Sequence, residues 1–246
     1  ERLRDVAAAC KKKNIELIPT GFSVGYGGSA LGHDRNFAAA LPTRLALRAN
    51  NGRIVPIQQE NLLTNGDLEE QTNNRFKGYA FHDDPGEISF ADSIAASGKT
   101  SIRFEGFGNK PYGHGRIMQN VSVIPGKTYR FSFRLKTQNL EPTTALTAMV
   151  LARGQTIADA HPNAKPTQDW TEFSINFINK GETNVAVYAG IWDGKSGKFW
   201  LDDLQFSEYG DLADIVRRAG TPLVLKSRDR DMVFTEGKDF AAIPCV

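Results

Sequence analysis

Cysteine is scarce in this sequence of 246 residues: Cys10 and Cys245, one near each end, are the only two. They could form a disulfide or stay as free thiols, and the sequence decides neither, so the redox compartment stays open. With four histidines and this cysteine pair, the chain offers no zinc-finger spacing of metal ligands. A zinc-finger site is therefore excluded.

Long apolar runs and an excess of one charge are missing as well. No run of about 18 apolar residues is present, which excludes a conventional membrane-spanning helix. The net charge of +2 provides no broad electrostatic surface for nucleic acid, so we expect neither a membrane nor a nucleic acid as partner. With 40% hydrophobic and 24% charged residues, the composition is that of an ordinary folded globular protein.

The first 58 residues predict a small α/β segment. Leu3 and Val6 begin an apolar pattern with helical spacing, which predicts an amphipathic helix and not a signal peptide, so an export signal would have to lie outside this chain. The apolar run Ile15–Pro19 predicts a buried strand, and Asn51–Gly52 predicts a hairpin turn. Because one helix–strand unit cannot bury itself, we expect segment 1–58 to be a fragment of a larger α/β fold.

Short strands separated by turn signals dominate residues 59–209. Every second residue from Tyr129 to Leu135 is apolar, which is typical of a strand with one buried and one exposed face. About ten such segments without helices between them predict an antiparallel β-sandwich, so the fold class is mainly β. Residues 210–246 are expected to form a C-terminal extension with a short helix at Asp211–Arg218 and short strands. The candidate strands of the sandwich are Leu62–Leu63, Gly66–Glu69, Glu87–Ala91, Thr100–Gly106, Arg116–Val123, Lys127–Thr137, Ala145–Leu151, Thr171–Phe177, Asn184–Ile191 and Lys198–Phe206.

Two adjacent carboxylates, Asp202 and Asp203, lie inside the last of these apolar strands. Two like charges in such a strand are costly unless a cation or a set of hydrogen-bond donors compensates them. A second acidic stretch, Asn61–Glu70, opens the β-rich region. We therefore expect the beginning and the end of the sandwich to be neighbours, with the carboxylates either at a bound cation or hydrogen-bonded.

Five blocks of sequence occur in a characteristic order: Asn61–Glu69, Ala96–Ile102, Val123–Lys136, Asp169–Thr171 and Trp200–Leu204. With these blocks the region resembles the β-sandwich carbohydrate-binding modules attached to xylanases and other glycoside hydrolases, within the galactose-binding-domain-like (jelly roll) fold. Segment 1–58 is similar to a strand–helix element of a (β/α)-barrel glycoside hydrolase, with the sandwich inserted after one of its loops. The resemblance implies a non-catalytic polysaccharide-binding module of a larger glycan-acting enzyme, located outside the cell or in the periplasm.

The resemblance also implies a structural calcium ion between the opening strand, the Ser-Gly-Lys turn and the last strand. Its ligands would be Glu69, Asp92, the backbone carbonyl of Lys99, and Asp202. Such hard oxygen donors suit Ca²⁺, which takes about six to eight of them. Asp203 is expected to face solvent. The alternative is that these carboxylates are surface or hydrogen-bonded groups without a metal.

Sugar binding is expected where aromatic and polar residues gather outside the strand cores. Sugar C–H faces stack on aromatic rings, and amide, carboxylate or guanidinium groups fix the hydroxyls. Three stretches offer this mixture: Tyr79–Asp84, Lys110–Gln119 and Gly190–Gly197. For each residue, the alternative is an ordinary core or surface side chain without a ligand. The candidates are Trp192, Tyr112 and Arg116 in the first place, and then Phe81, His82, His114 and Gln119.

Two other functions stay open. One is a fragment of a glycoside hydrolase whose barrel is mostly missing, with His33 and Asp34 in its cleft. The other is a structural or protein-interaction sandwich. Because a glycosidase needs two carboxylates flanking the scissile bond and Asp34 has no evident second carboxylate, we expect no catalytic residue in this chain. The expected partners are a polysaccharide or oligosaccharide and the rest of a multidomain enzyme.

Overall fold

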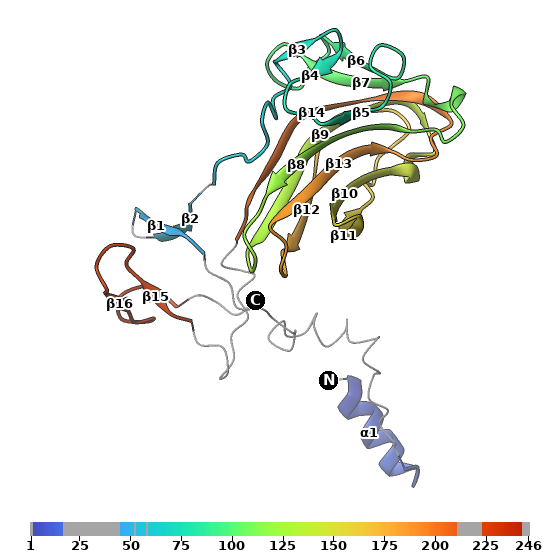
Figure 1. Cartoon of the computed structure of the whole chain (residues 1–246). Helices are drawn as coiled ribbons and strands as arrows, with labels where there is room; N and C mark the ends of the chain where they lie inside the picture. Colours follow the sequence, from blue (N-terminus) through green and yellow to red (C-terminus); the bar gives the residue numbers. More distant parts are fainter. Residues whose placement is uncertain (1, 17–44, 52, 58, 211–222, 243–246) are drawn as a thin grey trace. The chain divides into compact units, whose positions relative to one another are not determined.

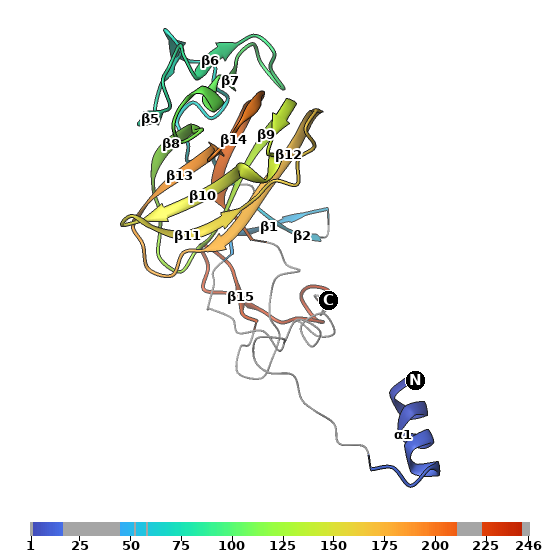
Figure 2. The same cartoon turned by 90° about the vertical axis from the view of Figure 1, so that its right-hand side faces the viewer.

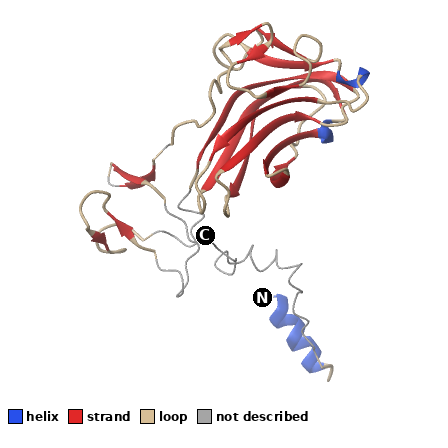
Figure 3. Cartoon of the chain, in the orientation of Figure 1, coloured by secondary structure: helices blue, strands red, loops and turns tan. Residues whose placement is uncertain are grey.

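The computed structural model of the protein describes residues 2–16, 45–51, 53–57, 59–210 and 223–242. Its contacts divide the chain into two compact units. One unit is Leu41–Asp214, and the other combines the terminal segments Glu1–Ala40 and Ile215–Val246. Nearly all regular secondary structure in the described residues is β-strand, and helix is rare (Figure 3).

The larger unit is an antiparallel β-sandwich made of two five-stranded sheets that lie face to face (Figures 1 and 2). One sheet, here called the β13 sheet, has the order β11-β10-β13-β8-β5, and the other, the β14 sheet, has the order β12-β9-β14-β7-β6. The strands of the β13 sheet are β11 (Gln155–Ala160), β10 (Leu146–Ala152), β13 (Asn184–Ile191), β8 (Gly115–Ser122) and β5 (Phe81–His82). The strands of the β14 sheet are β12 (Gln168–Ile178), β9 (Thr128–Glu141), β14 (Ser196–Glu208), β7 (Ser101–Glu105) and β6 (Ser89–Asp92). The predicted antiparallel β-sandwich is confirmed.

The core lies between the two sheets and is rich in aromatic rings. The period-two pattern of β9 places Tyr129 and Phe131 in this core, as the alternation predicts. The Tyr129 ring is stacked on Phe206 of β14 at 5.2 Å between centroids, and Phe104 is stacked on Phe199 at 4.8 Å. Such ring pairs add to the burial of apolar area, which is the main stabilising term of the sandwich.

The beginning and the end of the sandwich are neighbours, as expected. The Leu62 N–H donates to the Phe206 carbonyl at 2.7 Å. The Asn61 side chain forms two hydrogen bonds with the backbone of β14: its Nδ2 donates to the Leu204 carbonyl at 2.9 Å, and its Oδ1 accepts the Phe206 N–H at 2.8 Å. A single amide side chain thus ties the opening stretch to β14.

The predicted strands Leu62–Leu63 and Gly66–Glu69 are not strands in the structure. Residues 64–67 form a turn, in which the Leu68 N–H donates to the Asn65 carbonyl at 3.1 Å. Gly66 lies directly on β14, where a Cβ atom would come within 2.1 Å of the Leu204 carbonyl oxygen. Of the apolar residues that suggested these strands, Leu63 and Leu68 are buried without pairing in a sheet, whereas Leu62 is exposed.

Several smaller elements accompany the sandwich. The hairpin predicted around residues 51 and 52 is present as β1 (Leu47–Asn50) and β2 (Arg53–Pro56). A second hairpin, not predicted, consists of β3 (Gln71–Thr72) and β4 (Arg75–Phe76) and lies at the same end of the sandwich as β5 (Figure 1). Two short 3₁₀ helices cover Phe107–Asn109 and Thr143–Ala145.

The terminal unit contains helix α1 (Arg2–Lys12), as predicted, and the hairpin of β15 (Leu225–Lys226) and β16 (Val233–Phe234). Cys10 is a free thiol, and Cys245 lies outside the described residues. The predicted helix Asp211–Arg218 also lies outside them, as do most of the predicted strand Ile15–Pro19 and the loop with His33 and Asp34. Within the described residues, no helix combines the length and the apolar character needed to cross a membrane.

Candidate functional site

The outer face of the β13 sheet carries a cross-strand row of large side chains. Along β8 and β13 the residues alternate between the core and this face, so that Met118 and Tyr188 point outwards while Ile117 and Val187 are buried. The strand register places Phe81 of β5 next to Met118, Met118 next to Tyr188, and Tyr188 next to Met149 of β10. The row therefore crosses four strands of the sheet.

Arg116 is the charged centre of this face. Its Nε donates to Oδ2 of Asp83 at 2.8 Å, and its Nη2 donates to Oδ1 at 3.2 Å. Both side chains are largely shielded from solvent, with 19% and 16% of their surface exposed. The guanidinium lies over two rings, with its carbon 5.2 Å from the centroid of Phe81 and 5.5 Å from that of Trp192. The ion pair fixes the guanidinium plane, and the rings cover it on the sides.

The aromatic rings around Arg116 form a continuous surface. Tyr188 lies 6.3 Å from Phe81 and 6.3 Å from Trp192 between ring centroids, and both pairs are tilted. Trp192 follows directly after β13, where its N–H donates to the Ala145 carbonyl at 3.1 Å. Trp192, Phe81 and Tyr188 are all partly exposed. They present ring surface to solvent beside an oriented polar group.

Gly190 leaves the middle of this face without a side chain. It lies between Arg116 of β8 and Thr147 of β10 in the register. Its φ of 151° favours glycine, and a Cβ atom here would lie 2.3 Å from the Gly115 carbonyl oxygen. Gly190 is itself buried, so glycine here serves the close approach of β8 to β13 beside Arg116.

Two loops extend the aromatic surface beyond the sheet. Tyr112 is 73% exposed, and its ring is stacked on His114 at 5.7 Å. Asp193, next to Trp192, donates its N–H to the Tyr112 carbonyl at 3.1 Å, which holds the two loops together. Burial, followed by the nearby Arg116 charge, lowers the pKa of His114 below its usual value, so this ring is neutral at pH 7.

Polar groups continue the face on the side of β10 and β11. His161 Nδ1 lies 2.9 Å from the Leu146 carbonyl oxygen and 3.1 Å from Oγ1 of Thr147. If Nδ1 donates to the carbonyl, Nε2 of this exposed imidazole is available as an acceptor. The face thus combines aromatic rings with fixed donors and acceptors.

The structure brings five of the seven predicted sugar-binding residues together on this surface: Trp192, Tyr112, Arg116, Phe81 and His114. The other two, His82 and Gln119, have structural contacts. Gln119 is buried, where its Oε1 accepts the Thr64 N–H at 2.6 Å and its Nε2 donates to the Thr64 carbonyl at 2.9 Å. His82 faces away from the row and accepts the Phe76 N–H through Nε2 at 3.2 Å. Side chains along a strand point alternately to the two faces of the sheet, and His82 and Gln119 occupy positions whose side chains point away from the outer face.

Three residues of the face were missed as candidates from the sequence. Tyr188 is an aromatic residue at one of the outward-facing positions of β13, and the apolar alternation of that strand could have shown that its ring lies on the outer face. Asp83 belongs to a stretch that was recognised, but its pairing with Arg116 depends on the register of β5. Thr147 carries no signal of its own in the sequence.

The carboxylates predicted to bind calcium hold one loop, residues 92–101, by hydrogen bonds. Asp202 is completely buried; its Oδ2 accepts the N–H groups of Ala96 at 2.6 Å and Ser97 at 3.1 Å, and its Oδ1 accepts that of Asp203 at 2.7 Å. Burial raises the pKa of Asp202, and these N–H donors act in the opposite direction. Glu69 Oε1 accepts the N–H of Lys99 at 2.7 Å.

Asp92 completes this set of carboxylates. Its Oδ2 lies 2.8 Å from Arg103 Nε, and its Oδ1 accepts the Ile94 N–H at 2.9 Å. Asp203, expected to face solvent, is partly exposed and its Oδ1 accepts a hydrogen bond from the Ser97 hydroxyl. In the part of the chain that the structure describes, no cluster of three or more His, Cys, Asp or Glu side chains could hold a metal ion. As arranged here, the carboxylate oxygens fit backbone and side-chain donors and do not converge on a cation.

A family model described as a carbohydrate binding domain matches residues 60–195, which is more than half of the chain. No curated protein matches the chain. Among solved structures, TmCBM61 in complex with β-1,4-galactotriose aligns at 14% identity and a TM-score of 0.45, covering 61% of this chain and 99% of its own. A family 16 carbohydrate binding module-2 aligns at 21% identity and 0.45, covering 60% and 100%. A cyclase from Fischerella sp. TAU aligns at 12% identity and 0.48, covering 60% and 95%.

Proposed function

Because the chain belongs to the carbohydrate binding domain family, we propose that the outer face of its β13 sheet binds a polysaccharide or oligosaccharide without cleaving it. The observation that carries this proposal is the group formed by Arg116 with the rings of Phe81 and Trp192. Aromatic rings stack on the C–H faces of sugars, and a guanidinium donates to hydroxyl groups in its plane. The arrangement provides both kinds of contact at one place.

The extent of the face favours a chain of sugar units over a single sugar. The row from Phe81 on β5 to Met149 on β10 crosses four strands. With neighbouring strands about 4.8 Å apart, the row is about 15 Å long, to which the loop with Tyr112 adds further ring surface. Several sugar units of one glycan can lie along it.

The ion pairs around the face favour an uncharged glycan. Arg116 is neutralised by Asp83, and Lys110 lies 3.0 Å from Asp84 and 2.9 Å from Glu87. An acidic glycan would have to compete with carboxylates that are already in place. Neutral hydroxyl groups can accept hydrogen bonds from the guanidinium edge without breaking the pair.

Three wider features, predicted from the sequence, complete the proposal. The module is part of a larger glycan-acting enzyme, to which segment 1–58 would belong as a piece of a (β/α)-barrel. The parent protein acts outside the cell or in the periplasm. A structural Ca²⁺ at loop 92–101 is proposed from the resemblance alone, because Glu69, Asp92 and Asp202 accept hydrogen bonds from backbone N–H groups of this loop in the structure and would have to exchange them for the ion. The gene sequence on both sides of this chain tests the first two features, and the third has its own test in the Discussion.

The binding proposal is tested by affinity electrophoresis against neutral plant and algal polysaccharides, followed by titration calorimetry on those that retard the protein. Trp192→Ala is expected to weaken binding by about 30-fold, since loss of a central aromatic contact typically costs about 2 kcal/mol. Trp170→Ala is the matched control, because Trp170 is a partly exposed tryptophan on β12 of the other sheet. Absence of retardation on every polysaccharide, or equal weakening by both substitutions, would contradict the proposal.

A further inference from the structure

His82 lies on the reverse side of the strand that supplies two residues to the proposed site. In β5 and the residue that follows, the side chains alternate, so Phe81 and Asp83 contact Arg116 on the outer face while His82 points the other way. There its ring lies between two aromatic rings, 6.0 Å from Phe76 (interplanar angle 27°) and 6.0 Å from Tyr79. One imidazole therefore anchors the back of the strand whose front is part of the site.

The anchor depends on an unprotonated nitrogen. His82 Nε2 accepts the N–H of Phe76 at 3.2 Å, so the proton of the neutral ring is on Nδ1. A proton added to Nε2 uses the lone pair that accepts this bond and places an N–H donor opposite another N–H donor. Phe76 then loses its acceptor, and the ring gains a positive charge among aromatic neighbours.

The strand that carries His82 is short and is held from one side, by β8, whose Met118 and Arg116 carbonyls accept the N–H groups of Ala80 and Asp83 at 3.0 Å. β5 is a two-residue strand at the edge of the β13 sheet and pairs with β8 alone, with Phe81 opposite Met118 and His82 opposite Ile117. Short edge strands open locally at a small cost in free energy. A lost contact at His82 is thus transmitted to both neighbours in the chain.

We propose that neutral His82 is a positioning residue of the carbohydrate site, and that its protonation in acid releases β5 and weakens glycan binding. This inference rests on the proposed function. Phe81 then no longer flanks the guanidinium, and Asp83 no longer orients it. The site is competent at neutral pH and impaired at acidic pH without any ionisable group of the glycan taking part.

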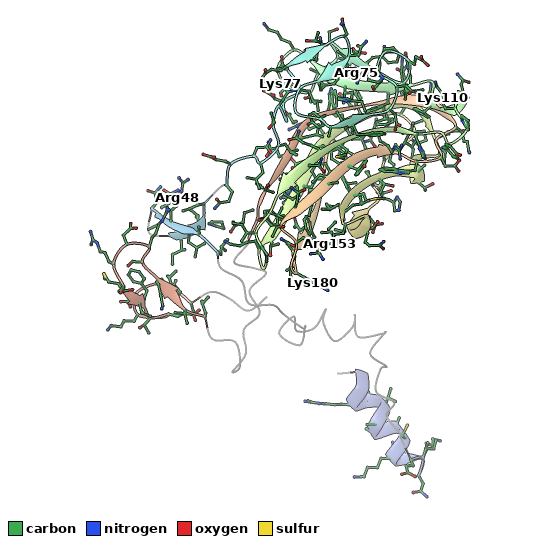
Figure 4. All side chains as sticks on the ribbon, in the orientation of Figure 1. Arg48, Arg75, Lys77, Lys110, Arg153 and Lys180 are labelled. Carbon is green, nitrogen blue, oxygen red and sulfur yellow. The ribbon has the colours of Figure 1, made fainter. Side chains whose placement is uncertain are left out.

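The surroundings of His82 keep it neutral over a wide pH range. Burial, followed by the positive charge of Arg75 on β4, lowers the pKa of His82 to about 4. Arg75 lies on the β3–β4 hairpin at this end of the sandwich (Figure 4). Tyr79, which packs on the ring, has a raised hydroxyl pKa because of its burial and the charges of Asp67 and Asp202. On the β8 side the nearest charge pair is that of Arg116, which faces the opposite side of the strand.

Glycan affinity as a function of pH tests the inference. If only the neutral form of His82 binds, the apparent affinity falls about twofold at pH 4 and about tenfold at pH 3 relative to pH 7, following the fraction of competent protein. His82→Gln supplies an amide oxygen near the position of Nε2 that accepts the Phe76 N–H but does not titrate. Carboxylates in general titrate in the same range, and this variant retains all of them. We expect it to bind as the wild type at pH 7 and to lose the acid-dependent fall.

His114→Gln is the control for the second histidine near the site, and it should keep the acid-dependent fall seen in the wild type. A second measurement follows the free protein by NMR from pH 7 to pH 3, on both sides of the expected midpoint of His82. The Arg116 Nε–H and Trp192 indole signals should shift with the midpoint of the His82 ring in the wild type and stay constant in His82→Gln.

The outcomes separate the two proposals. A wild type that binds no glycan at pH 7 overturns the proposed function. A wild type that binds at pH 7 with an affinity independent of pH, or a His82→Gln variant with the same fall, overturns the role of His82 while the binding function stands. Site signals that ignore the His82 titration overturn it as well, even where the protein unfolds before pH 3.

Discussion

Arg116 and Asp83 face each other with two nearly parallel hydrogen bonds, Nε to Oδ2 at 2.8 Å and Nη2 to Oδ1 at 3.2 Å, on the outer face of the β13 sheet. The pairing joins β8 to the residue after β5, which are 33 positions apart in the chain. It sets the plane of the guanidinium, and thereby the direction in which its remaining N–H groups can donate. The specificity of the proposed site depends on this orientation more than on the charge.

Arg116→Lys should therefore impair both binding and stability. Lysine keeps the charge but cannot form two parallel bonds, so we expect about tenfold weaker glycan binding and a loss of about 1–2 kcal/mol in the free energy of unfolding. Calorimetric titration and thermal melting provide the two measurements. Arg134→Lys is the matched control, because its partner Asp203 is 3.4 Å away and the arginine is 45% exposed. Equal effects in both variants would show that Arg116 has no special role.

Asp202→Asn tests whether the buried carboxylate is needed as an acceptor. The amide would place an NH₂ group against N–H donors of Ala96, Ser97 or Asp203, and one buried donor would stay unsatisfied. We expect a loss of about 2–3 kcal/mol in the free energy of unfolding, measured by urea denaturation. Asp169→Asn, at a side chain that is 83% exposed, should change it by less than about 0.5 kcal/mol. A stable Asp202→Asn variant would disprove the structural role.

Calcium binding is decided by thermal melting in calcium and in a chelator. A bound ion stabilises by about 2.7 kcal/mol when its concentration is a hundredfold above the dissociation constant, so the melting temperature should rise by several degrees. The increase should disappear in Glu69→Gln, since this residue is one of the predicted ligands. The same melting temperature with and without the metal would assign Glu69, Asp92 and Asp202 to hydrogen bonding alone.

The stability of the sandwich should fall in mild acid because of His82. Its pKa is about 4 in the folded protein and 6.5 in the unfolded chain, so between these values the unfolded chain binds more protons. The free energy of unfolding is therefore fully present above about pH 6.5 and decreases as the pH falls towards 4, by up to about 3 kcal/mol. Urea denaturation across this range should show a smaller decrease in His82→Gln. If the free energy of unfolding fell equally with pH in the wild type and in His82→Gln, His82 would not be the cause of the decrease.

The long strands were predictable and the short ones were not. β9 and β13 each show the period-two pattern over many residues, which determines both the element and its buried face. β5 has two residues, Phe81 and His82, and so contains no period to recognise. Its existence depends on pairing with β8, which is a long-range contact. The gap in the sequence-based prediction is therefore at the edge of the sheet, where the proposed site begins.

The sequence predicted which residue types make up the site but not the face of the sheet to which each side chain points. A stretch such as Tyr79–Asp84 shows that aromatic and polar groups are present, and it cannot show which of them face the same side. Phe81 and Asp83 face Arg116 on the outer face of the sheet, whereas His82 between them does not. Gln119 likewise occupies one of the buried positions of β8, which alternate with the outward-facing ones. The missing information was the register, which tertiary contacts decide.

The hydrogen bonds of Asn61 to Leu204 and Phe206 mean that the backbone comes into the sandwich and leaves it side by side. The two crossing points are about one strand spacing apart. Because these two points are so close, a sandwich of this kind could be inserted in a surface turn of another domain without a large change in that domain's backbone. Asn61 thus holds the first and the last strand region of the sandwich together at one point, whatever lies on either side of them in the chain.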